Sequence, residues 1–291
     1  MNIQRIPLLV AVLLAAFLAA CGAKTTTETK EAAQAPVPQR NTRTIAPPKE
    51  DPHWSYEVAD GPSMWGKLSA KWKECAAGRS QSPIDIAKTS DAKLPALKAE
   101  FRPAELKIIH HEHMADVVNT GHSIQVNYTE GDKLKLGNEE FELLQYHFHS
   151  PSEHTVRGKH YPMEMHMVHR SADKKLAVVG VFIEEGAANP AFDSVWSNLP
   201  EARGVEHHLP NVKVDVNQLL PQKTNTYRYS GSLTTPPCSE DVQWVIMTTP
   251  IQMSASQIEK FRNILKGNNR PPQPLYSRAV VTEMASESVI Q

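Results

Sequence analysis

The sequence predicts a β-rich domain with a large sheet and only short helices at its periphery. Several segments alternate apolar and polar residues, as strands with one covered face do. Two others, residues 176–184 and 242–248, are almost continuously apolar, which is typical of central strands covered on both faces. Prolines also outnumber glycines, 22 to 13, which favours extended, loop-rich stretches over a helix bundle.

Three further strands are expected before these apolar runs. Their alternation of apolar and polar residues indicates that each buries one face. They cover residues 117–128, with a break at Gly121, residues 141–149 and residues 163–169. The body shows no internal repeat and no second linker, so we expect a single domain.

Helices are few, and residues 190–197 and 254–265 are the best candidates. In the second segment, Ile258, Phe261 and Leu265 recur at helical spacing and form an apolar stripe. A serine just before this stripe is suited to the N-cap position, because its hydroxyl can accept a hydrogen bond from an unpaired backbone N–H.

The composition excludes some classes of protein. Lys and Arg total 31 and Asp and Glu total 32, a formal net charge of −1. A nucleic-acid partner is therefore not expected, because its phosphates require an excess of positive charge. Hydrophobic residues make up 40% and charged residues 22% of the chain, an ordinary globular mixture.

The first twenty residues, 1–20, have the pattern of an export signal. Arg5 is followed by an uncharged apolar run that is too short to span a bilayer comfortably but suits a signal peptide. The run ends in the letters LAACG, which resemble the lipobox of bacterial lipoproteins. That resemblance implies a lipid on Cys21 and export to the periplasmic or cell-surface side of a bacterial membrane. Gly22 favours the outer membrane, and an ordinary secretory signal is the alternative.

Residues 21–50 combine this cysteine with a stretch that has no aromatic residue. Such a stretch cannot offset the entropy of ordering, so we expect a flexible tether before a folded domain at residues 51–291. Once Cys21 carries lipid, Cys75 and Cys238 remain in an oxidising compartment. They are expected to form a disulfide, with two buried free thiols as the alternative.

Histidines on two neighbouring predicted strands suggest a metal site. Gln145, His147 and His149 alternate along one strand and therefore share a face. Glu164 and His166 share a face of the next strand, so His166 would complete a three-histidine site if the two strands pair. Three nitrogen ligands with an open position are the pattern of catalytic zinc, whose bound water has a pKa of about 7. Spacing alone leaves a structural role open.

Five motifs in chain order resemble the α-class carbonic anhydrases. They are QSPID from Gln81, HFHSPSEHT from His147, EMH from Glu164, GSLTTPP from Gly231 and RPPQPL from Arg270. The resemblance implies a single α/β domain dominated by a large, mainly antiparallel, twisted sheet of about ten strands, with short peripheral helices. It also implies a lyase that hydrates carbon dioxide reversibly to bicarbonate and a proton, and it supports the disulfide expected above.

The resemblance assigns catalytic roles to individual residues. His147, His149 and His166 correspond to the ligands of Zn²⁺. Thr234 corresponds to the residue that accepts a hydrogen bond from the attacking zinc-bound hydroxide, and Glu153 to the carboxylate that orients it. A hydroxyl that must donate to a carboxylate can only accept from the zinc-bound group.

Other residues are expected to support this centre. Gln145 and Glu164 correspond to residues that hold the ligand imidazoles in the required tautomer, although either could be an ordinary polar residue of its strand. His122 corresponds to the proton shuttle, because an imidazole with a near-neutral pKa can relay a proton. An exposed histidine at a strand end is the alternative.

The resemblance also implies a substrate pocket for carbon dioxide and bicarbonate. A tyrosine is expected to order water there, and apolar residues are expected to form a wall suited to an uncharged substrate. These residues are Tyr56, Val168, Val178, Leu233, Thr235, Val242 and Trp244. The lipid anchor is the only other partner expected, and the choice between a monomer and a homodimer stays open.

Two other functions deserve comparison: a non-catalytic binding module on the same scaffold, and a zinc hydrolase of esters. The three ligand histidines, Thr234 and Glu153 are all present, which disfavours a binding module. A narrow apolar pocket disfavours bulky esters.

Overall fold

The structure is a computed structural model that describes residues 51–91, 97–100, 104–105, 117–127, 133–203, 206–207 and 213–283. All of them belong to one unit, Lys49–Gln291. The export signal expected at residues 1–20 and the tether and Cys21 expected at residues 21–50 lie outside the described residues.

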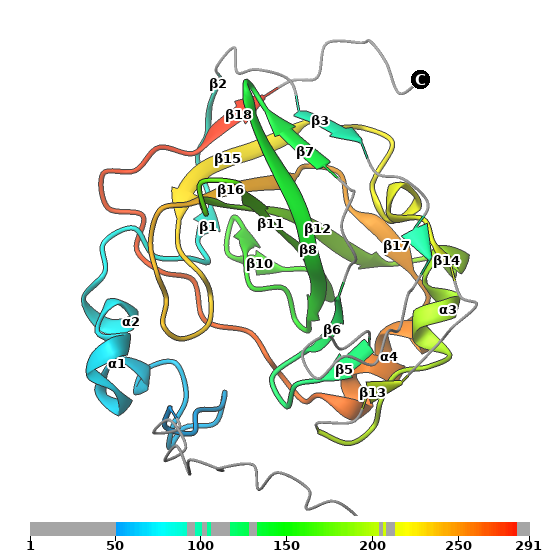
Figure 1. The fold of residues 1–291 in the computed structure, drawn as a ribbon, viewed down its shortest axis with the longest axis horizontal. Helices are drawn as coiled ribbons and strands as arrows, with labels where there is room; N and C mark the ends of the chain where they lie inside the picture. Colours follow the sequence, from blue (N-terminus) through cyan, green and yellow to red (C-terminus); the bar gives the residue numbers. More distant parts are fainter. Residues whose placement is uncertain are drawn as a thin grey trace, which may run out of the picture. The chain divides into compact units, whose positions relative to one another are not determined.

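A large sheet runs through this unit (Figure 1). Ten strands follow one path across it, in the order β13 (Glu206–His207), β5 (Val117–Asn119), β6 (Ile124–Asn127), β8 (Glu139–His149), β11 (Met163–Ser171), β12 (Leu176–Glu185), β16 (Val242–Met247), β15 (Thr226–Gly231), β18 (Val281–Glu283) and β2 (Ser90–Asp91). Most neighbours are antiparallel, whereas β12 and β16 are parallel, as are β18 and β2. The predicted large, mainly antiparallel sheet is confirmed.

Shorter strands flank this path. Within the large sheet, β3 (Leu97–Glu100) pairs with β7 (Lys133–Leu136), β7 pairs with β8, and β17 (Ile251–Met253) pairs with β12. Two small sheets contain β1 (Asp85–Ile86), β9 (Thr155–Val156) and β10 (Lys159–His160), and β4 (Ala104–Glu105) and β14 (Lys213–Val214). The segment predicted at 117–128 is divided into β5 and β6 around Gly121, whose φ of 83° requires a residue that tolerates the left-handed region.

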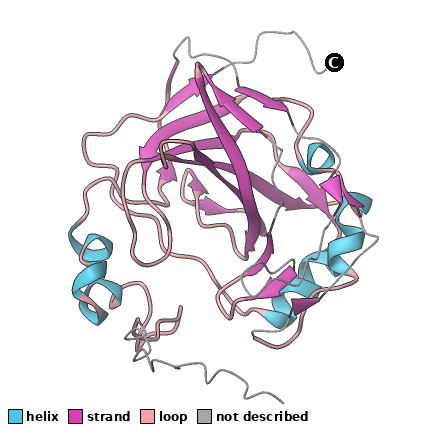
Figure 2. Cartoon of the chain, in the orientation of Figure 1, coloured by secondary structure: helices cyan, strands magenta, loops and turns pink. Residues whose placement is uncertain are grey.

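The helices are short and lie outside the sheet (Figure 2). They are α1 (Trp65–Leu68), η1 (Ala70–Trp72), α2 (Glu74–Ala77), η2 (Pro190–Phe192), α3 (Asp193–Trp196), η3 (Val216–Leu219) and α4 (Ala255–Ile264). The helix predicted at 254–265 is α4, which Ser254 caps in a reciprocal capping box with Gln257. The first three were not predicted, because single turns are too short to show helical periodicity.

The two faces of the sheet carry separate apolar cores. The larger core contains Tyr146 and Phe148 of β8, together with residues that include Met165 and Met167 of β11. The alternate residues of these strands point to the opposite face, where a smaller core contains Val168. The histidines of β8 therefore project away from the larger core, toward the side that carries the smaller one.

The predicted disulfide between Cys75 and Cys238 is present. It packs with Trp65 and Trp72 in a small cluster beside the sheet. It thereby joins α2 to the loop that follows β15.

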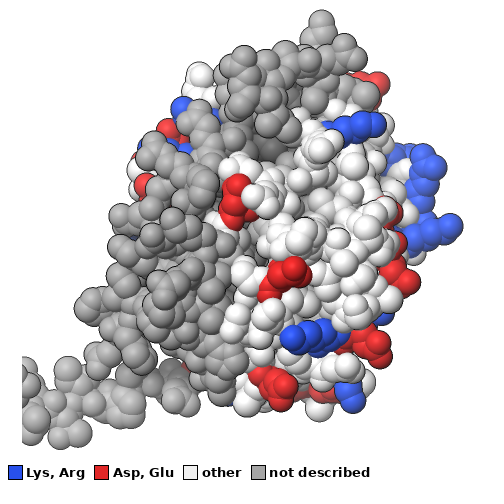
Figure 3. Space-filling view, turned by 90° about the vertical axis from the view of Figure 1, so that its right-hand side faces the viewer, with Lys and Arg blue, Asp and Glu red and all other residues white. Residues whose placement is uncertain are grey.

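Acidic and basic side chains are both scattered over the described part of the face in Figure 3. This mixture agrees with the near-zero net charge of the chain. Within the described residues, none of the helices has the length and apolar character needed to span a membrane.

Candidate metal centre

The register of two strands brings three histidines together. His166 of β11 lies directly opposite His147 of β8 in an antiparallel ladder. Because side chains alternate along a strand, His149 lies on the same face as His147. A bulge between Val168 and His169 shifts the register only beyond this cluster.

The three imidazoles converge on one point. The ring centroids lie 5.0 Å apart for His147 and His149, 5.3 Å for His147 and His166, and 4.6 Å for His149 and His166. One nitrogen from each ring lies within 4.8 Å of the other two. Three nitrogens at this separation can bind one metal ion and leave a coordination position open.

Each ring is held by an acceptor on the nitrogen that does not face the cluster. The three bonds join His147 Nδ1 to Gln145 Oε1 at 2.8 Å, His149 Nδ1 to the backbone oxygen of Asn268 at 2.7 Å, and His166 Nε2 to Glu164 Oε1 at 2.8 Å. An acceptor keeps a proton on the nitrogen it contacts, so the other nitrogen carries the lone pair. His149 Nε2 is accordingly buried without a hydrogen-bond partner among the described residues.

Electrostatics favour neutral rings at His147 and His149, whereas Glu164 and Glu153 outweigh burial at His166 and raise its pKa. Burial, together with the neighbouring His149 and His166, lowers the pKa of His147. Burial also lowers the pKa of His149, although Glu153 opposes that shift. Neutral imidazole is the form that binds a metal. Three imidazole nitrogens in a buried site are a donor set that suits zinc.

Glu164 connects His166 to a second buried chain of hydrogen bonds. Its Oε1 also accepts from His154 Nδ1 at 2.7 Å, and its Oε2 accepts from the backbone N–H of His154 at 2.9 Å. Burial alone would raise the pKa of Glu164, but the two histidines lower it well below its usual range. The Tyr229 hydroxyl lies 2.6 Å from His154 Nε2. His154, Glu164 and His166 also lie close enough together to hold a metal ion, but their facing atoms are already joined by hydrogen bonds.

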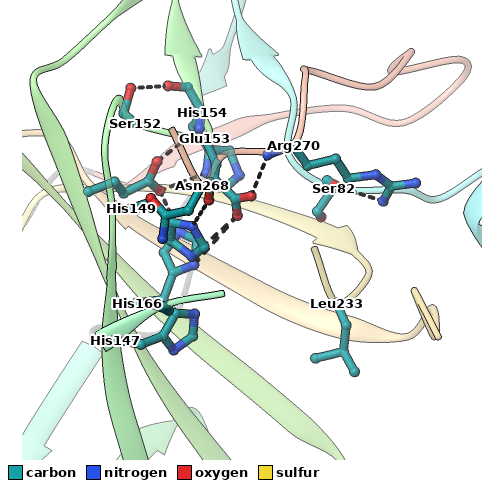
Figure 4. Close-up of polar contacts among 12 residues, drawn as sticks. Ser82, His147, His149, Ser152, Glu153, His154, His166, Leu233, Asn268 and Arg270 are labelled. Atoms are coloured by element: carbon teal, nitrogen blue, oxygen red, sulfur yellow. Dashed lines mark hydrogen bonds and ion pairs between the residues drawn. The ribbon is translucent and has the colours of Figure 1, made fainter. Parts of the chain in front are cut away.

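Glu153 reaches the same cluster. Its Oε1 accepts from the backbone N–H of Arg270 at 2.8 Å (Figure 4). Its Oε2 lies 3.6 Å from His149 Nε2 and 3.8 Å from His166 Nδ1. This oxygen is buried and has no hydrogen-bond partner among the described residues. Thr234 is buried, but the expected hydrogen bond from its hydroxyl to Glu153 is not formed in this structure, where Glu153 Oε2 has no partner among the described residues.

The expected apolar wall lies beside the histidines. The ring of Trp244 is 4.9 Å from that of His166. The wall residues belong to one buried apolar cluster, against which Leu233 packs; its members include Val168, Val178, Val242 and Trp244. The wall is continuous across the sheet because Val178 is the ladder partner of both Val168 and Trp244.

Tyr56 and Thr235 have less direct relations to the cluster. The Tyr56 hydroxyl is buried without a partner among the described residues, and burial and the charge of Glu153 raise its pKa. The backbone oxygen of Thr235 accepts from the N–H of Cys238 at 2.8 Å, which ties its loop to the disulfide.

His122 lies in the loop between β5 and β6. The hydroxyl of Thr120 accepts from the backbone N–H groups of His122 and Ser123, at 3.1 and 3.0 Å. The His122 ring stacks on Trp54, with centroids 3.6 Å apart and planes 10° apart. Burial, Arg203 and His53 together lower the pKa of His122 to about 4.

Sequence reasoning missed three contributions to this site. Asn268 holds His149 through its backbone oxygen, and its side-chain amide donates to the backbone oxygen of His122 at 3.0 Å. Gly180 packs closely against Glu164, because a Cβ there would lie 3.2 Å from Glu164 Oε1 and 2.5 Å from Ile246 Cδ1, and both side chains would have to shift. His154 lies within a quoted motif, but its position next to Glu164 was not foreseen.

Comparison with known proteins places the chain among relatives of stated activity. A family profile described as eukaryotic-type carbonic anhydrase matches residues 60–284. A carbonic anhydrase from Nostoc sp. is 43% identical over 234 residues, which cover 79% of this chain and 85% of that protein.

Solved structures agree with this match. The α-carbonic anhydrase from Thermovibrio ammonificans, in complex with sulfanilamide, shares 42% identity and a TM-score of 0.72, covering 79% of this chain and 98% of that one. A hyperthermostable carbonic anhydrase from a hydrothermal vent chimney shares 43% identity and a TM-score of 0.73, covering 79% of this chain and 99% of that one.

Proposed function

The chain belongs to the eukaryotic-type carbonic anhydrase family, and from that premise we propose that it hydrates carbon dioxide reversibly at a zinc ion held by His147, His149 and His166. One observation carries the proposal. Three ring nitrogens face a common point, and each ring is oriented by an acceptor on its other nitrogen.

The surrounding residues prepare these rings for the metal. Zinc held by three imidazoles lowers the pKa of a bound water to about 7 and so supplies a nucleophile at neutral pH. Gln145, Glu164 and the backbone oxygen of Asn268 hold the tautomers that direct lone pairs at the metal.

Thr234 and Glu153 orient the attack in this proposal. Glu153 Oε2 faces the cluster and has no hydrogen-bond partner among the described residues, so it can accept from the Thr234 hydroxyl. That donation leaves only lone pairs on the hydroxyl oxygen, which must then accept from the attacking group. Carbon dioxide, which is uncharged, would lie against the apolar wall that begins at Trp244.

His122 carries the released proton away in this proposal. A histidine can take up and release a proton near neutral pH. Burial of the ring, which stacks on Trp54, disfavours the charged form. Proton uptake therefore requires a more solvated position of the ring.

We also propose that the enzyme is an exported lipoprotein anchored through Cys21. The disulfide between Cys75 and Cys238 supports export, because such bonds persist in oxidising compartments. Mass spectrometry of the membrane fraction is expected to find a lipid on Cys21, and a Cys21→Ala variant should leave the membrane. Recovery of unmodified Cys21 in the soluble fraction would contradict the anchor.

The metal centre is tested by zinc content and stopped-flow hydration of carbon dioxide on the purified chain. We expect about one zinc per chain and inhibition by sulfanilamide. His149→Gln should lose the zinc and slow hydration by at least about a hundredfold. His160→Gln, which changes an exposed histidine outside the cluster, is the control. A folded chain without zinc would overturn the proposal.

A further inference from the structure

A cavity of about 620 Å³ lies beside His122. Its volume falls within the range of about 300 to 1,000 Å³ that small-molecule sites occupy. His122 and His53 contribute to its lining, together with the charged residues Asp51, Lys71 and Arg203. The lining includes none of the three clustered histidines, so a molecule bound there would contact the shuttle and not the metal.

The charges around this cavity do not cancel. Lys71 Nζ lies 2.8 Å from Asp51 Oδ1, so these two residues neutralise each other. Arg203 forms no ion pair with another residue that the structure describes. The lining therefore carries a positive charge without a partner, which attracts anions.

Arg203 is held next to the shuttle. A Cβ on Gly121 would lie 2.6 Å from both Cδ and Nε of Arg203, so the side chain packs directly on the residue before His122. Its charge also reaches the imidazole, because Arg203 is the main contributor, after burial, to the low pKa of His122.

One nitrogen of the His122 ring lacks an acceptor for a proton. Its Nδ1 is buried with no hydrogen-bond partner among the described residues. The other titratable groups near it are His53, whose ring centroid is 6.4 Å away, and Asp60, whose Oδ2 lies 3.5 Å from His53 Nε2. A proton on His122 must therefore pass to a molecule from solution, and the cavity is where such a molecule can reach the ring.

We propose that this cavity binds a small oxyanion, such as hydrogen phosphate, which takes the proton from His122. The proposal rests on the proposed function, because the hydration of carbon dioxide produces that proton. The N–H bond of the imidazolium breaks and an O–H bond forms on the anion. HPO₄²⁻ becomes H₂PO₄⁻, and His122 returns to its neutral form.

The maximal rate of carbon dioxide hydration, measured against buffer concentration at constant ionic strength, tests the site. The buffers are inorganic phosphate and imidazole. Arg203→Gln is expected to raise the half-saturating phosphate concentration about fivefold, as loss of one exposed charge contact can. Asp51→Asn should lower it, because Lys71 is then free. Arg170→Gln removes the same charge from an exposed position outside the cavity and is the control.

The second buffer, imidazole, distinguishes anion binding in the cavity from a general change in proton transfer by His122. Its half-saturating concentration should change less than about twofold in either cavity variant, because a neutral acceptor does not depend on the charge. Equal phosphate dependence in wild type and Arg203→Gln would overturn the oxyanion site.

Binding is also measured directly, without carbon dioxide. Inorganic phosphate should shift the ring proton resonances of His122 and His53 in wild type, and less in Arg203→Gln. No shift would overturn the site even if hydration is fast. Slow hydration in every buffer would instead contradict the proposed function, and phosphate-dependent shifts would still support the site.

Discussion

The His122 ring is half-buried and stacks on Trp54. The rings are nearly parallel at 3.6 Å, and burial of the imidazole is the first reason for the low pKa of His122, about 4. Arg203 and His53 lower it further, and Asp60 opposes them. In this position the ring is neutral at pH 7, so it accepts a proton only after leaving the stack.

Replacing the stacking partner should change this pKa in a known direction. In Trp54→Ala, the solvated ring should titrate at least about one unit closer to the usual value of about 6.5. Trp54→Phe keeps an aromatic partner and should retain most of the depression. The measurement is the chemical shift of the His122 ring proton against pH, and identical curves for the three proteins would show that the stack has no influence.

The depressed pKa of His122 also makes the free energy of unfolding depend on pH. Because the folded-state pKa is depressed, the unfolded chain binds more protons between about pH 4 and pH 6.5. The contribution of neutral His122 is therefore present above about pH 6.5 and is lost as the pH falls toward 4. Wild type should lose stability in this window more steeply than Trp54→Ala.

Strands β8 and β11 show what the sequence could predict. Alternation alone predicts that His147 and His149 share a face and that His166 shares one with Glu164. The ladder that places His166 opposite His147 was only a condition in that prediction, because register depends on contacts between distant parts of the chain. The resemblance to a family supplied the roles that spacing left open.

Contacts made by backbone and loops could not be predicted in this way. His149 is oriented by the carbonyl of Asn268, 119 residues further along the chain, and every residue type carries such a carbonyl. Arg203 packs on Gly121, although nothing in the residues around either position indicates that the two loops meet. Periodicity reports which face of an element is buried, and not which loop covers it.

The molecule as a whole places the three clustered histidines and Thr234 on different supports, strands in one case and a loop in the other. The three histidines project from β8 and β11, which lie near the middle of the sheet. Thr234 lies instead in the loop after β15, which the disulfide at Cys238 joins to α2. Loss of the disulfide should therefore change the position of the Thr234 loop more than it changes the zinc content.

The variant Cys75→Ala/Cys238→Ala should test this difference. The bond closes a sequence separation of 163 residues, so chain entropy predicts a loss of up to about 5 kcal/mol in the free energy of unfolding. Urea unfolding measures that loss, and reduction of wild type with dithiothreitol should reproduce it. Below the unfolding transition, we expect full zinc content but slower hydration, because the ligands stay on the sheet while the Thr234 loop is released. Loss of zinc from the folded variant would show that the loop also supports the ligands.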